Sequence, residues 1–258
     1  MGEKIIYITG ASSGIGAALA KRFAADGVVL CLLTNSDAQK LGEVVHECRQ
    51  KGAVANTFLA DVRDRQAMII IAAEIIEKHG SPDIVIANAG IGPADPDDYF
   101  ESDTAEEVMS VNFFGVINTL VPFIEPMKAR GNGQFVIVSS VSSLRSTPNS
   151  GLYSASKAAA SRWAEGIRFR LKPFGIHTTT ICPGFVDTSM TEASRFPMPG
   201  IISADEAARL IINAIVRKRA TYYMPLVARV IWRTFYVLPD GLYNIVMSLA
   251  YKYWPSRS

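Results

Sequence analysis

The fold is decided by the stretch Thr9-Gly10-Ala11-Ser12-Ser13-Gly14-Ile15-Gly16, which follows the apolar run Ile5-Ile6-Tyr7-Ile8 and opens a helix-forming segment. We therefore expect a strand, a glycine-rich turn and a helix in that order. Such a turn lets backbone amides and the positive end of a helix dipole approach a pyrophosphate closely, because no β-carbon is in the way. A second interpretation is open at this point: the glycines could only permit positive φ angles in a tight connection.

Length, charge and cysteine usage limit the class of protein. The chain has 258 residues, which suits one large α/β domain with a substantial core. Its net charge is +2 and its basic residues are spread along the chain, so nucleic acid is not an expected partner. The three cysteines and three histidines lack disulfide or metal-ligand spacing, so we expect no metal site and a reducing compartment. The first residues carry no long apolar signal region, which favours the cytoplasm.

Short β-branched runs alternate with longer amphipathic segments along the chain. The predicted strands are Lys4–Thr9, Val28–Leu33, Val54–Leu59, Asp83–Ala87, Gln134–Ser139, Ile176–Ile181 and Thr221–Met224. The predicted helices are Ile15–Asp26, Asp37–Gly52, Arg63–His79, Thr104–Arg130, Ser154–Pro173 and Ala204–Arg217. Alternation of this kind builds parallel strands joined by right-handed crossovers. We therefore expect an α/β fold: a doubly wound Rossmann-type three-layer sandwich with a seven-stranded parallel sheet.

Polar residues that could take part in catalysis lie near the ends of the predicted strands, where ligands bind in such sheets. Tyr153 and Lys157 are four residues apart, a spacing that places both on one face of a helix. Ser140 follows the strand Gln134–Ser139 directly, thirteen residues before Tyr153. Asn112 lies in a helical segment that should pack beside it. The spacing predicts that the side chains of Tyr153 and Lys157 can touch.

Together with the glycine turn and with Ala87-Asn88-Ala89-Gly90 at another strand end, this set resembles the short-chain dehydrogenase/reductase family from about Lys4 to Met224. The resemblance implies a catalytic tetrad of Asn112, Ser140, Tyr153 and Lys157. It also implies a cofactor site whose residues lie at five strand ends and on the tetrad helix: Gly10, Ser12, Ser13, Gly14, Ile15, Gly16, Asn35, Ser36, Asp61, Val62, Asn88, Ala89, Gly90, Tyr153, Lys157, Pro183, Gly184, Val186 and Thr188.

The chemistry of the tetrad follows from the side chains themselves. A free tyrosine has a pKa of about 10, and an adjacent ammonium and an oxidised nicotinamide both favour its phenolate. Lys157 would therefore tune Tyr153, which would donate a proton to a carbonyl oxygen as hydride arrives, or accept one from an alcohol. Ser140 would hydrogen-bond the same oxygen. Asn112 would hold a water that links Lys157 to solvent.

Several of these positions also have a structural interpretation. Another serine of residues 139–143 could be the functional one in place of Ser140. Asn112 could satisfy a buried carbonyl, and Asp61 could cap the next helix instead of contacting adenine. Asn88 could bridge two strands while Gly90 gives the cofactor access, and both roles can hold together.

The end of the second predicted strand bears on the choice between NAD and NADP. An acidic residue there accepts hydrogen bonds from the ribose hydroxyls and repels a 2′-phosphate. Asn35 occupies that position by its offset from Asp61, and a neutral amide removes the repulsion. Ser36 and Ser13 are neutral where NADP-using relatives often carry a basic residue, and Asp37 could cap the following helix. The balance favours NADP(H) over NAD(H).

The segment Phe185–Ser203 follows the last catalytic strand and mixes apolar residues with proline and glycine. It is interpreted as a mobile substrate lid with an apolar wall formed by Met190, Phe196, Met198 and Ile201. An apolar ketone or alcohol is favoured as substrate, although these side chains could also pack the lid against its own domain. Arg145 and Arg195 could recognise an acidic substituent or be solvated surface charges.

The composition changes after Met224. Nine of the twenty-four aromatic residues lie between Thr221 and Ser258, so residues 226–258 are expected to extend the catalytic domain 1–225 as an aromatic-rich tail. Two apolar stripes on either side of Pro239-Asp240-Gly241 predict two short amphipathic helices: Leu226, Val230, Val237 and Leu238, then Leu242, Ile245, Val246, Leu249 and Tyr253. Both are shorter than the ~18–20 residues that span a bilayer. They could lie on a membrane surface, but packing on the sheet or a subunit interface is favoured.

The combined prediction is an NAD(P)(H)-dependent oxidoreductase that interconverts a ketone and a secondary alcohol on an apolar substrate. It is expected to form a homodimer or homotetramer in the cytoplasm, with peripheral membrane contact as an open alternative. Two other functions suit the glycine turn: a non-catalytic, redox-sensing regulator that binds a dinucleotide, and a methyltransferase. The complete tetrad argues against both.

Overall fold

The computed structural model describes residues 3–92, 102–148, 150–192 and 198–252. The first half contains β1 (Lys4–Thr9), α1 (Gly14–Phe23), β2 (Val28–Thr34), α2 (Ala38–Gln50), β3 (Val54–Leu59), α3 (Arg65–His79), β4 (Ile84–Ala87), α4 (Ser102–Met109), α5 (Gly115–Leu120) and α6 (Ile124–Arg130). The second half contains β5 (Gly133–Val138), α7 (Gly151–Leu171), β6 (Ile176–Pro183), β7 (Val186–Asp187), α8 (Ser189–Glu192), β8 (Ile202–Ser203), α9 (Ala204–Val216), β9 (Thr221–Met224), α10 (Leu226–Val237) and α11 (Asp240–Lys252).

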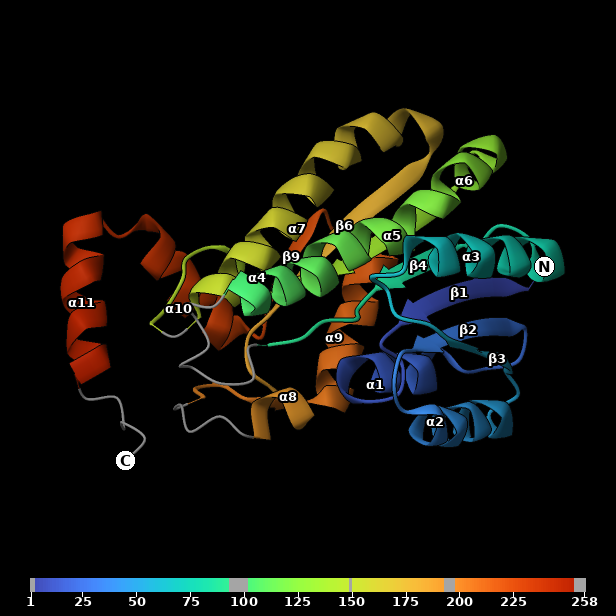
Figure 1. Ribbon diagram of the computed structural model, residues 1–258, viewed down its shortest axis with the longest axis horizontal. Helices are drawn as coiled ribbons and strands as arrows, with labels where there is room; N and C mark the ends of the chain where they lie inside the picture. The colour runs from blue at the N-terminus through green and yellow to red at the C-terminus, as the bar shows by residue number, and fades with distance from the viewer. Residues whose placement is uncertain (1–2, 93–101, 149, 193–197, 253–258) are drawn as a thin grey trace.

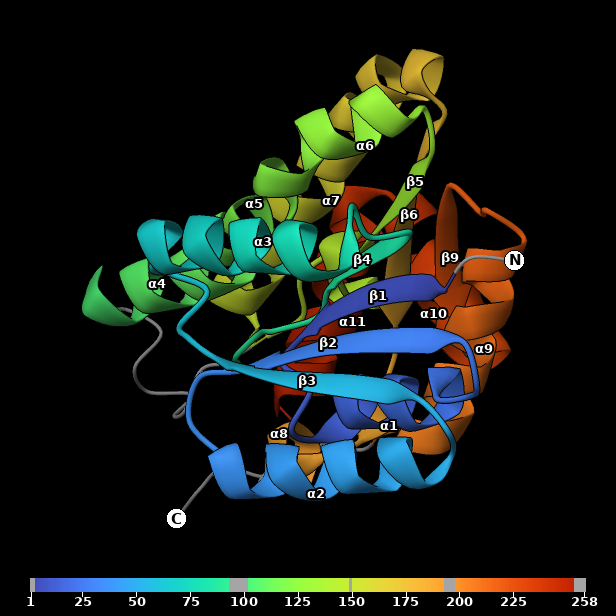
Figure 2. The ribbon, with the colours of Figure 1, turned by 90° about the vertical axis from the view of Figure 1, so that its right-hand side faces the viewer.

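Seven parallel strands form one sheet in the order β3-β2-β1-β4-β5-β6-β9. The helices α1, α2 and α9 cover one face, and α3, α5 and α7 cover the other (Figures 1 and 2). The strand order reverses between β1 and β4, because the chain builds outward from β1 in one direction and then from β4 in the other. The predicted three-layer sandwich with a seven-stranded parallel sheet is confirmed.

Both faces of the sheet are buried, as expected for parallel strands. Along β1, Ile6 and Ile8 point into the core beneath α1 and α2, whereas Ile5 and Tyr7 point into the core beneath α3 and α5. This alternation follows from the two-residue period of a strand. The strands therefore form a rigid floor whose carboxyl ends can hold a site in fixed geometry.

The predicted helix Thr104–Arg130 is not uniform. Its turns widen to a π-helical segment at Ser110–Phe114, where the amide of Gly115 donates to the Ser110 carbonyl five residues earlier. They tighten to a 3-10 segment at Val121–Phe123, which contains Pro122. Proline has no amide hydrogen to donate, so the regular ladder cannot pass through it. A 3.6-residue hydrophobic period does not distinguish these local changes of pitch.

Among the described residues, the helical stretch Ser102–Arg130 has the length and mean hydropathy (1.4) that a membrane-spanning helix also has. Its apolar character has another cause in this fold. The buried side chains of the stretch belong to the core of the sandwich: Val108, Val111, Val116, Leu120, Phe123 and Met127. The stretch therefore forms part of one helical layer over the sheet.

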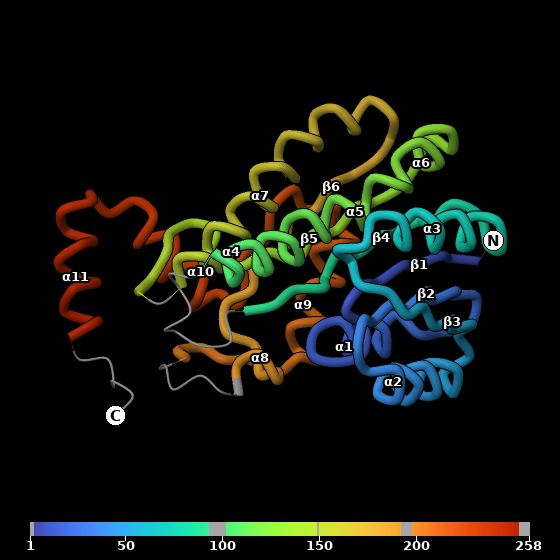
Figure 3. The backbone as a smooth tube through the Cα atoms, in the orientation of Figure 1, coloured from blue at the N-terminus to red at the C-terminus, as the bar shows by residue number. Residues whose placement is uncertain are grey.

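Two helices follow the sheet, as the apolar stripes predict. α10 packs against β9 and against the loop after β5, and α11 extends from it at the end of the molecule opposite α6 (Figures 1 and 3). The predicted stripes face outward, however. The buried residues of the pair are Ala228 and Trp232 on α10 and Tyr243 on α11, whereas the stripe residues Leu226 and Ile245 are 64% and 62% exposed. The stripe residue Tyr253 lies outside the described residues.

Arg145 anchors this C-terminal pair. Its guanidinium donates to the carbonyls of Phe235 and Leu238 at 3.1 and 2.8 Å, pairs with Asp240 at 2.7 Å, and lies 3.7 Å from the centroid of the Tyr243 ring. The first two bonds satisfy carbonyls at the C-terminal end of α10, which have no helical partner. The interpretation of Arg145 as a solvated surface charge is therefore wrong, and its contact with an acidic substituent of the substrate stays a prediction.

Candidate active site

The glycine-rich turn follows β1 and lies beside the end of β4. The Asn88 amide nitrogen, Nδ2, donates to the carbonyls of Thr9 and Gly10 at 3.0 and 3.1 Å. In return, Thr9 Oγ1 accepts from the backbone amides of Asn88 and Ala89 at 3.2 Å. Asn88 thus has the expected bridging role between strand ends. It fixes the turn at the point where the strand order reverses.

The backbone of this turn requires glycine. Gly10 and Gly14 have φ angles of +66° and +51°, in the region that side chains disfavour. A β-carbon on Gly16 would lie 2.1 Å from the Gly10 carbonyl oxygen, and one on Gly10 would lie 2.9 Å from the Ala89 α-carbon. The turn is therefore packed so closely that only hydrogen fits at these positions.

The first turn of α1 is suited to a phosphate group. Ser13 precedes the helix in an extended conformation and its side chain makes no capping hydrogen bond, and the first turn of α1 holds no acidic residue. The first amides of a helix have no intrahelical partner, and the helix dipole favours an anion there. The described residues of the turn thus fit a dinucleotide pyrophosphate by their geometry.

Other predicted cofactor residues gather around the same turn. Ser12 Oγ is 2.9 Å from Thr34 Oγ1 at the end of β2, and Ile15 is partly buried against the core. The methyl group of Thr188 would lie 3.0 Å from a β-carbon on Gly14, so the segment after β6 closes over the turn. The structure brings these distant parts of the chain together.

The segment that carries Thr188 is held by its own hydrogen bonds. Pro183 ends β6, and the amide of Gly184 donates to the Met224 carbonyl at 2.7 Å. Val186 lies in β7, which pairs with Ile202 of β8 in a two-stranded sheet that the sequence analysis did not predict. Short strands of two residues give no recognisable hydrophobic period.

The expected ribose end lies at the ends of β2 and β3. Asn35 and Ser36 are exposed, and the Asn35 side chain hydrogen-bonds Asp61. Arg63 pairs with Asp61 at 2.7 Å, and its hydrogen bonds lower the pKa of that carboxyl below the ordinary value. The cap of α3 is Asp64, whose side chain accepts from the Ala67 amide. The capping interpretation of Asp61 is therefore wrong.

Val62, the next predicted cofactor residue, is buried against α5. A β-carbon on Gly115 would lie 2.6 Å from its Cγ2 methyl group. Asp37, in contrast, is confirmed as a helix cap: its side chain accepts from the Lys40 amide at 2.9 Å at the start of α2.

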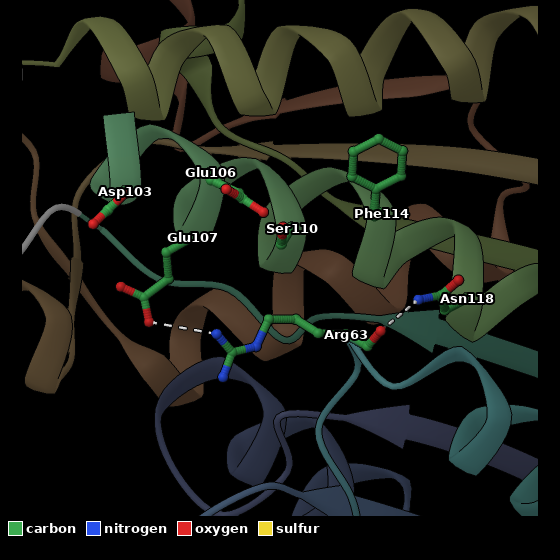
Figure 4. Close-up of a pocket in the computed structure, with 7 residues that line it drawn as sticks. All are labelled: Arg63, Asp103, Glu106, Glu107, Ser110, Phe114 and Asn118. Atoms are coloured by element: carbon green, nitrogen blue, oxygen red, sulfur yellow. Dashed lines mark hydrogen bonds and ion pairs between the residues drawn. The ribbon is translucent and has the colours of Figure 1, made fainter. Parts of the chain in front are cut away.

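A pocket of about 590 Å³ lies next to Arg63, between the start of α3 and the layer formed by α4 and α5 (Figure 4). Arg63 extends towards Glu107, with which it pairs at 3.7 Å. The full lining is Arg63, Asp103, Glu106, Glu107, Ser110, Phe114 and Asn118. None of the four tetrad residues lines this pocket, and the sequence analysis did not predict it.

Tyr153 and Lys157 both lie on α7, which begins at Gly151 and not at Ser154 as predicted. Lys157 Nζ is 5.7 Å from the centroid of the Tyr153 ring and donates to the Val138 carbonyl at 3.2 Å. The lysine is only 3% exposed. Burial lowers the pKa of Lys157 to about 8, because desolvation disfavours the ammonium form.

The phenol of Tyr153 is affected by two opposing influences. Burial raises the pKa of Tyr153 above its ordinary value, and the hydrogen bond with the Ser140 side chain lowers it. Burial is the stronger influence. In the protein alone, the phenol is therefore neutral at physiological pH.

The serines after β5 have separate roles. Ser139 Oγ donates to the Lys157 carbonyl at 3.0 Å and lies 2.7 Å from Ser161 Oγ, so its hydroxyl fastens α7 to the strand end. Ser143 Oγ donates to the Ser140 carbonyl at 2.7 Å. The Ser140 hydroxyl is the one that bonds Tyr153, and it also accepts from the Ser142 amide at 3.1 Å.

Asn112 is fully buried in the π-helical segment. Its Nδ2 donates to the Ile91 carbonyl at 2.8 Å and to Ser156 Oγ at 3.0 Å, and its Oδ1 accepts from the Ile91 amide at 2.9 Å. Asn112 therefore satisfies a buried carbonyl, as the structural interpretation proposed. It ties the segment after β4 to Ser156, in the second turn of α7.

Gly90 lies next to two members of the tetrad, Asn112 and Lys157. A β-carbon at this position would lie 3.0 Å from Asn112 Oδ1 and 3.0 Å from Lys157 Nζ. A β-carbon on Gly90 would therefore crowd both polar groups after the end of β4. Asn112, Lys157, Ser140 and Tyr153 thus lie around one strand edge.

The predicted lid is described only in part. Met190 is half exposed on α8, and a β-carbon on Gly92 would lie 3.8 Å from its Cγ, so the start of the predicted lid lies next to the segment that follows β4. Ile201 is 43% exposed and precedes β8. Arg195 and Phe196 lie outside the described residues.

The chain is similar in sequence to several oxidoreductases. A family model for short chain dehydrogenases matches residues 4–198. The chain is 29% identical over 262 residues to the probable oxidoreductase EphD of Mycobacterium tuberculosis; the match covers 93% of this chain but only 44% of that protein. It is 31% identical over 260 residues to a fatty acyl-CoA reductase of Acinetobacter baylyi, with 99% and 86% covered.

Solved structures give the same result. An alcohol dehydrogenase of the archaeon Thermococcus sibiricus, complexed with 5-hydroxy-NADP, is 27% identical with a TM-score of 0.77, covering 92% of this chain and 99% of that one. A short-chain dehydrogenase/reductase of Burkholderia phymatum in complex with NAD is 25% identical with a TM-score of 0.81, covering 90% and 92%. The family model, the similar oxidoreductases and the shared fold show that the chain belongs to the short-chain dehydrogenase/reductase family of NAD(P)-binding oxidoreductases.

Proposed function

We propose that this oxidoreductase interconverts a ketone and a secondary alcohol on an apolar substrate, with Tyr153 as general acid and base and NADP(H) as the preferred cofactor. The observation that carries the proposal is the meeting of Tyr153, Ser140 and Lys157 at the strand edge beside the glycine-rich turn. The test is turnover of a panel of aromatic and aliphatic ketones with NADPH and with NADH. Tight NADPH binding without any turnover would instead support the redox-sensing regulator.

Each residue of the tetrad has a separate role in the proposed proton transfer. The hydroxyls of Ser140 and Tyr153 lie within hydrogen-bonding reach of each other, so a carbonyl oxygen that replaces their mutual bond would accept from both. The nicotinamide, when bound, supplies the hydride and, in its oxidised form, a positive charge. That charge, together with the Lys157 ammonium 5.7 Å from the centroid of the Tyr153 ring, would oppose the burial that raises the pKa of the phenol. Asn112 holds the segment after β4 in place, and its Oδ1 lies on the side of Gly90 that Lys157 also reaches.

The cofactor preference rests on the charge at the end of β2. Asn35 and Ser36 are neutral and exposed there. The nearby carboxylate of Asp37 is engaged by the Lys40 amide and pairs with the Lys40 ammonium at 3.1 Å, so it does not present a free negative charge. A 2′-phosphate would meet no unpaired carboxylate among these residues. One similar structure holds an NADP derivative and another holds NAD, so the family accommodates either cofactor.

Replacing Asn35 with aspartate tests this preference. The new carboxylate would repel a 2′-phosphate and accept from ribose hydroxyls, so the ratio of kcat/KM with NADPH to that with NADH should fall about tenfold or more, equivalent to about 1.4 kcal/mol. Steady-state kinetics with both cofactors measure the ratio. Asn213→Asp on the exposed side of α9 adds the same charge elsewhere and should leave the ratio unchanged. An unchanged ratio in Asn35→Asp would contradict the assignment.

The Ser140 role is separable from that of its neighbours. Ser140→Ala removes the hydroxyl that bonds Tyr153 and should lower kcat about 10²-fold, the usual effect of losing one such donor. Ser142→Ala keeps the loop backbone and removes a hydroxyl that makes no side-chain bond among the described residues, so its kcat should stay close to wild type. The reverse order of the two effects would assign the role to Ser142.

The pH dependence of reduction follows from Lys157. Its pKa of about 8 means that the ammonium is present at neutral pH and is lost as the pH rises through that value. Tyr153 stays protonated over this range because burial raises its pKa. The kcat/KM for ketone reduction should therefore decline above about pH 8 in a rate profile of the free enzyme. A kcat/KM that stays constant up to about pH 10, the ordinary tyrosine pKa, would contradict the assignment of this decline to Lys157.

The substrate and the assembly are further parts of the proposal. An apolar substrate is supported by half-exposed Met190, which lies close to Gly92 after β4, and by the relative named as a fatty acyl-CoA reductase. We propose that the enzyme is a cytoplasmic homodimer or homotetramer; the assembly is supported by exposed Phe169 on α7, Phe174 directly after α7 and Phe114 in the π-helical segment. Light scattering measures this assembly directly.

A further inference from the structure

The outward surface of α10 and α11 is apolar. Seven residues form what we call the C-terminal apolar face; each is at least 40% exposed: Leu226, Val230, Val237, Leu242, Ile245, Val246 and Leu249. They belong to the two apolar stripes for which the sequence analysis favours packing on the sheet or at a subunit interface, with a membrane surface as the alternative. A set of neighbouring exposed apolar residues of this size marks a surface that binds another molecule.

The described contacts of α10 and α11 with the rest of the domain bury little of their apolar surface, so they contribute little to the stability of the two helices in water. α11 has thirteen residues, of which Tyr243 alone is buried among the described ones. Short isolated helices are marginally stable, and most helical stability comes from packing of an apolar face. The inward contacts of Trp232 and Tyr243 hold the pair to the domain but leave the larger apolar face uncovered.

The charges beside this face are positive. Arg229, Arg233 and Lys252 are its cations, and Asp240 is the one carboxylate within α10 and α11. Asp240 is already paired with Arg145 at 2.7 Å. A two-fold dimer through this face would place like charges against one another, because the same patch is used twice. An anionic lipid surface complements both the charge and the apolar residues.

We infer that the C-terminal apolar face binds the surface of an anionic bilayer, with α10 and α11 lying in the interface. The helices have twelve and thirteen residues, too short to span a bilayer, which needs ~20, but long enough to lie in its headgroup region. Tyr236 and Tyr251, both exposed on the same helices, suit that region because their rings are apolar and their hydroxyls are polar.

The face is connected to the active-site loop. Arg145 and Ser146 follow the loop that carries Ser140, and they bind the end of α10 and the Tyr243 hydroxyl of α11. Trp232 packs in one cluster with Val141, the residue directly after Ser140. A membrane-bound α10 would therefore hold the Ser140 loop near the bilayer. In that arrangement, and only if the proposed function holds, the substrate is an apolar carbonyl compound drawn from the lipid phase.

The test is flotation of the full chain with two kinds of vesicle: phosphatidylcholine alone, and phosphatidylcholine mixed with phosphatidylserine. Wild type should float with the mixed vesicles and less with phosphatidylcholine, and added salt should weaken the binding. The double variant Val230→Glu, Ile245→Glu should lose about tenfold or more of its partitioning, since two exposed apolar side chains that would enter the bilayer are replaced by anions. The matched variant Val54→Glu, Val216→Glu changes two valines 48% and 69% exposed elsewhere, and should bind like wild type.

Two further measurements separate the outcomes. Circular dichroism confirms that both double variants are folded. Sedimentation velocity without lipid shows whether the face binds a second copy of the chain. If wild type fails to float and forms an oligomer that dissociates in Val230→Glu, Ile245→Glu, the inference is overturned in favour of self-association. Equal flotation of the two double variants would also overturn it. Tyr153→Phe should float like wild type, so lipid binding can fail or succeed independently of catalysis.

Discussion

Tyr153→Phe is expected to abolish turnover, lowering kcat about 10²–10⁴-fold, the range attributed to a positioned acid or base. The substitution removes the hydroxyl that bonds Ser140 and leaves the ring in place between the strand edge and Lys157. The affinity for NADPH should stay within about threefold of wild type, because the lost group serves the transition state more than ground-state binding. Steady-state kinetics and fluorescence titration with NADPH measure the two quantities.

Tyr7→Phe is a matched control for this experiment. The Tyr7 hydroxyl is buried in the core and has no hydrogen-bond partner among the described residues. Its removal should leave kcat and thermal stability close to wild type, since no hydrogen bond is lost. Residual activity in Tyr153→Phe comparable to that of Tyr7→Phe would refute the acid and base role.

Lys157→Ala should damage both turnover and cofactor affinity. The ammonium lies beside the Tyr153 ring and close to Gly90, where the ribose of a nicotinamide nucleotide would be held, so it acts on proton transfer and on binding. We expect kcat to fall about 10²-fold or more and the Kd for NADPH to rise about tenfold, or about 1.4 kcal/mol. Titration and kinetics with the same protein sample give both numbers.

The two substitutions must be compared at equal stability. Lys157→Ala removes the donor to the Val138 carbonyl and leaves a cavity, so its thermal midpoint should fall and the assays need a temperature at which both variants are folded. An equal loss of NADPH affinity in Tyr153→Phe and Lys157→Ala would contradict the separate roles assigned to them.

The sequence alone predicts the parts of the fold that depend on local patterns. The glycine turn requires positive φ at Gly10 and Gly14, and the four-residue spacing of Tyr153 and Lys157 follows from the pitch of a helix. The hydrophobic runs fix the strands because parallel strands are buried on both faces. These features do not depend on distant residues, and so the sheet and the strand ends were predictable.

Other features depend on partners far away along the chain. Arg145 binds residues about ninety positions later, and no local pattern indicates that Phe235 and Leu238 offer free carbonyls to it. Asp61 and Asp64 are equally plausible caps by type, and only the backbone geometry selects Asp64. The apolar stripes of α10 and α11 are visible in the sequence, but the direction they face depends on which side Trp232 packs.

The most direct test of the central claim is transfer of label from the cofactor to the product. With NADPH deuterated at the reactive face of nicotinamide C4, mass spectrometry of the alcohol formed by wild-type enzyme should show deuterium at the carbinol carbon. The hydroxyl proton should come from solvent through Tyr153. An alcohol with solvent hydrogen at that carbon, or no alcohol with any ketone and either cofactor, would contradict the account.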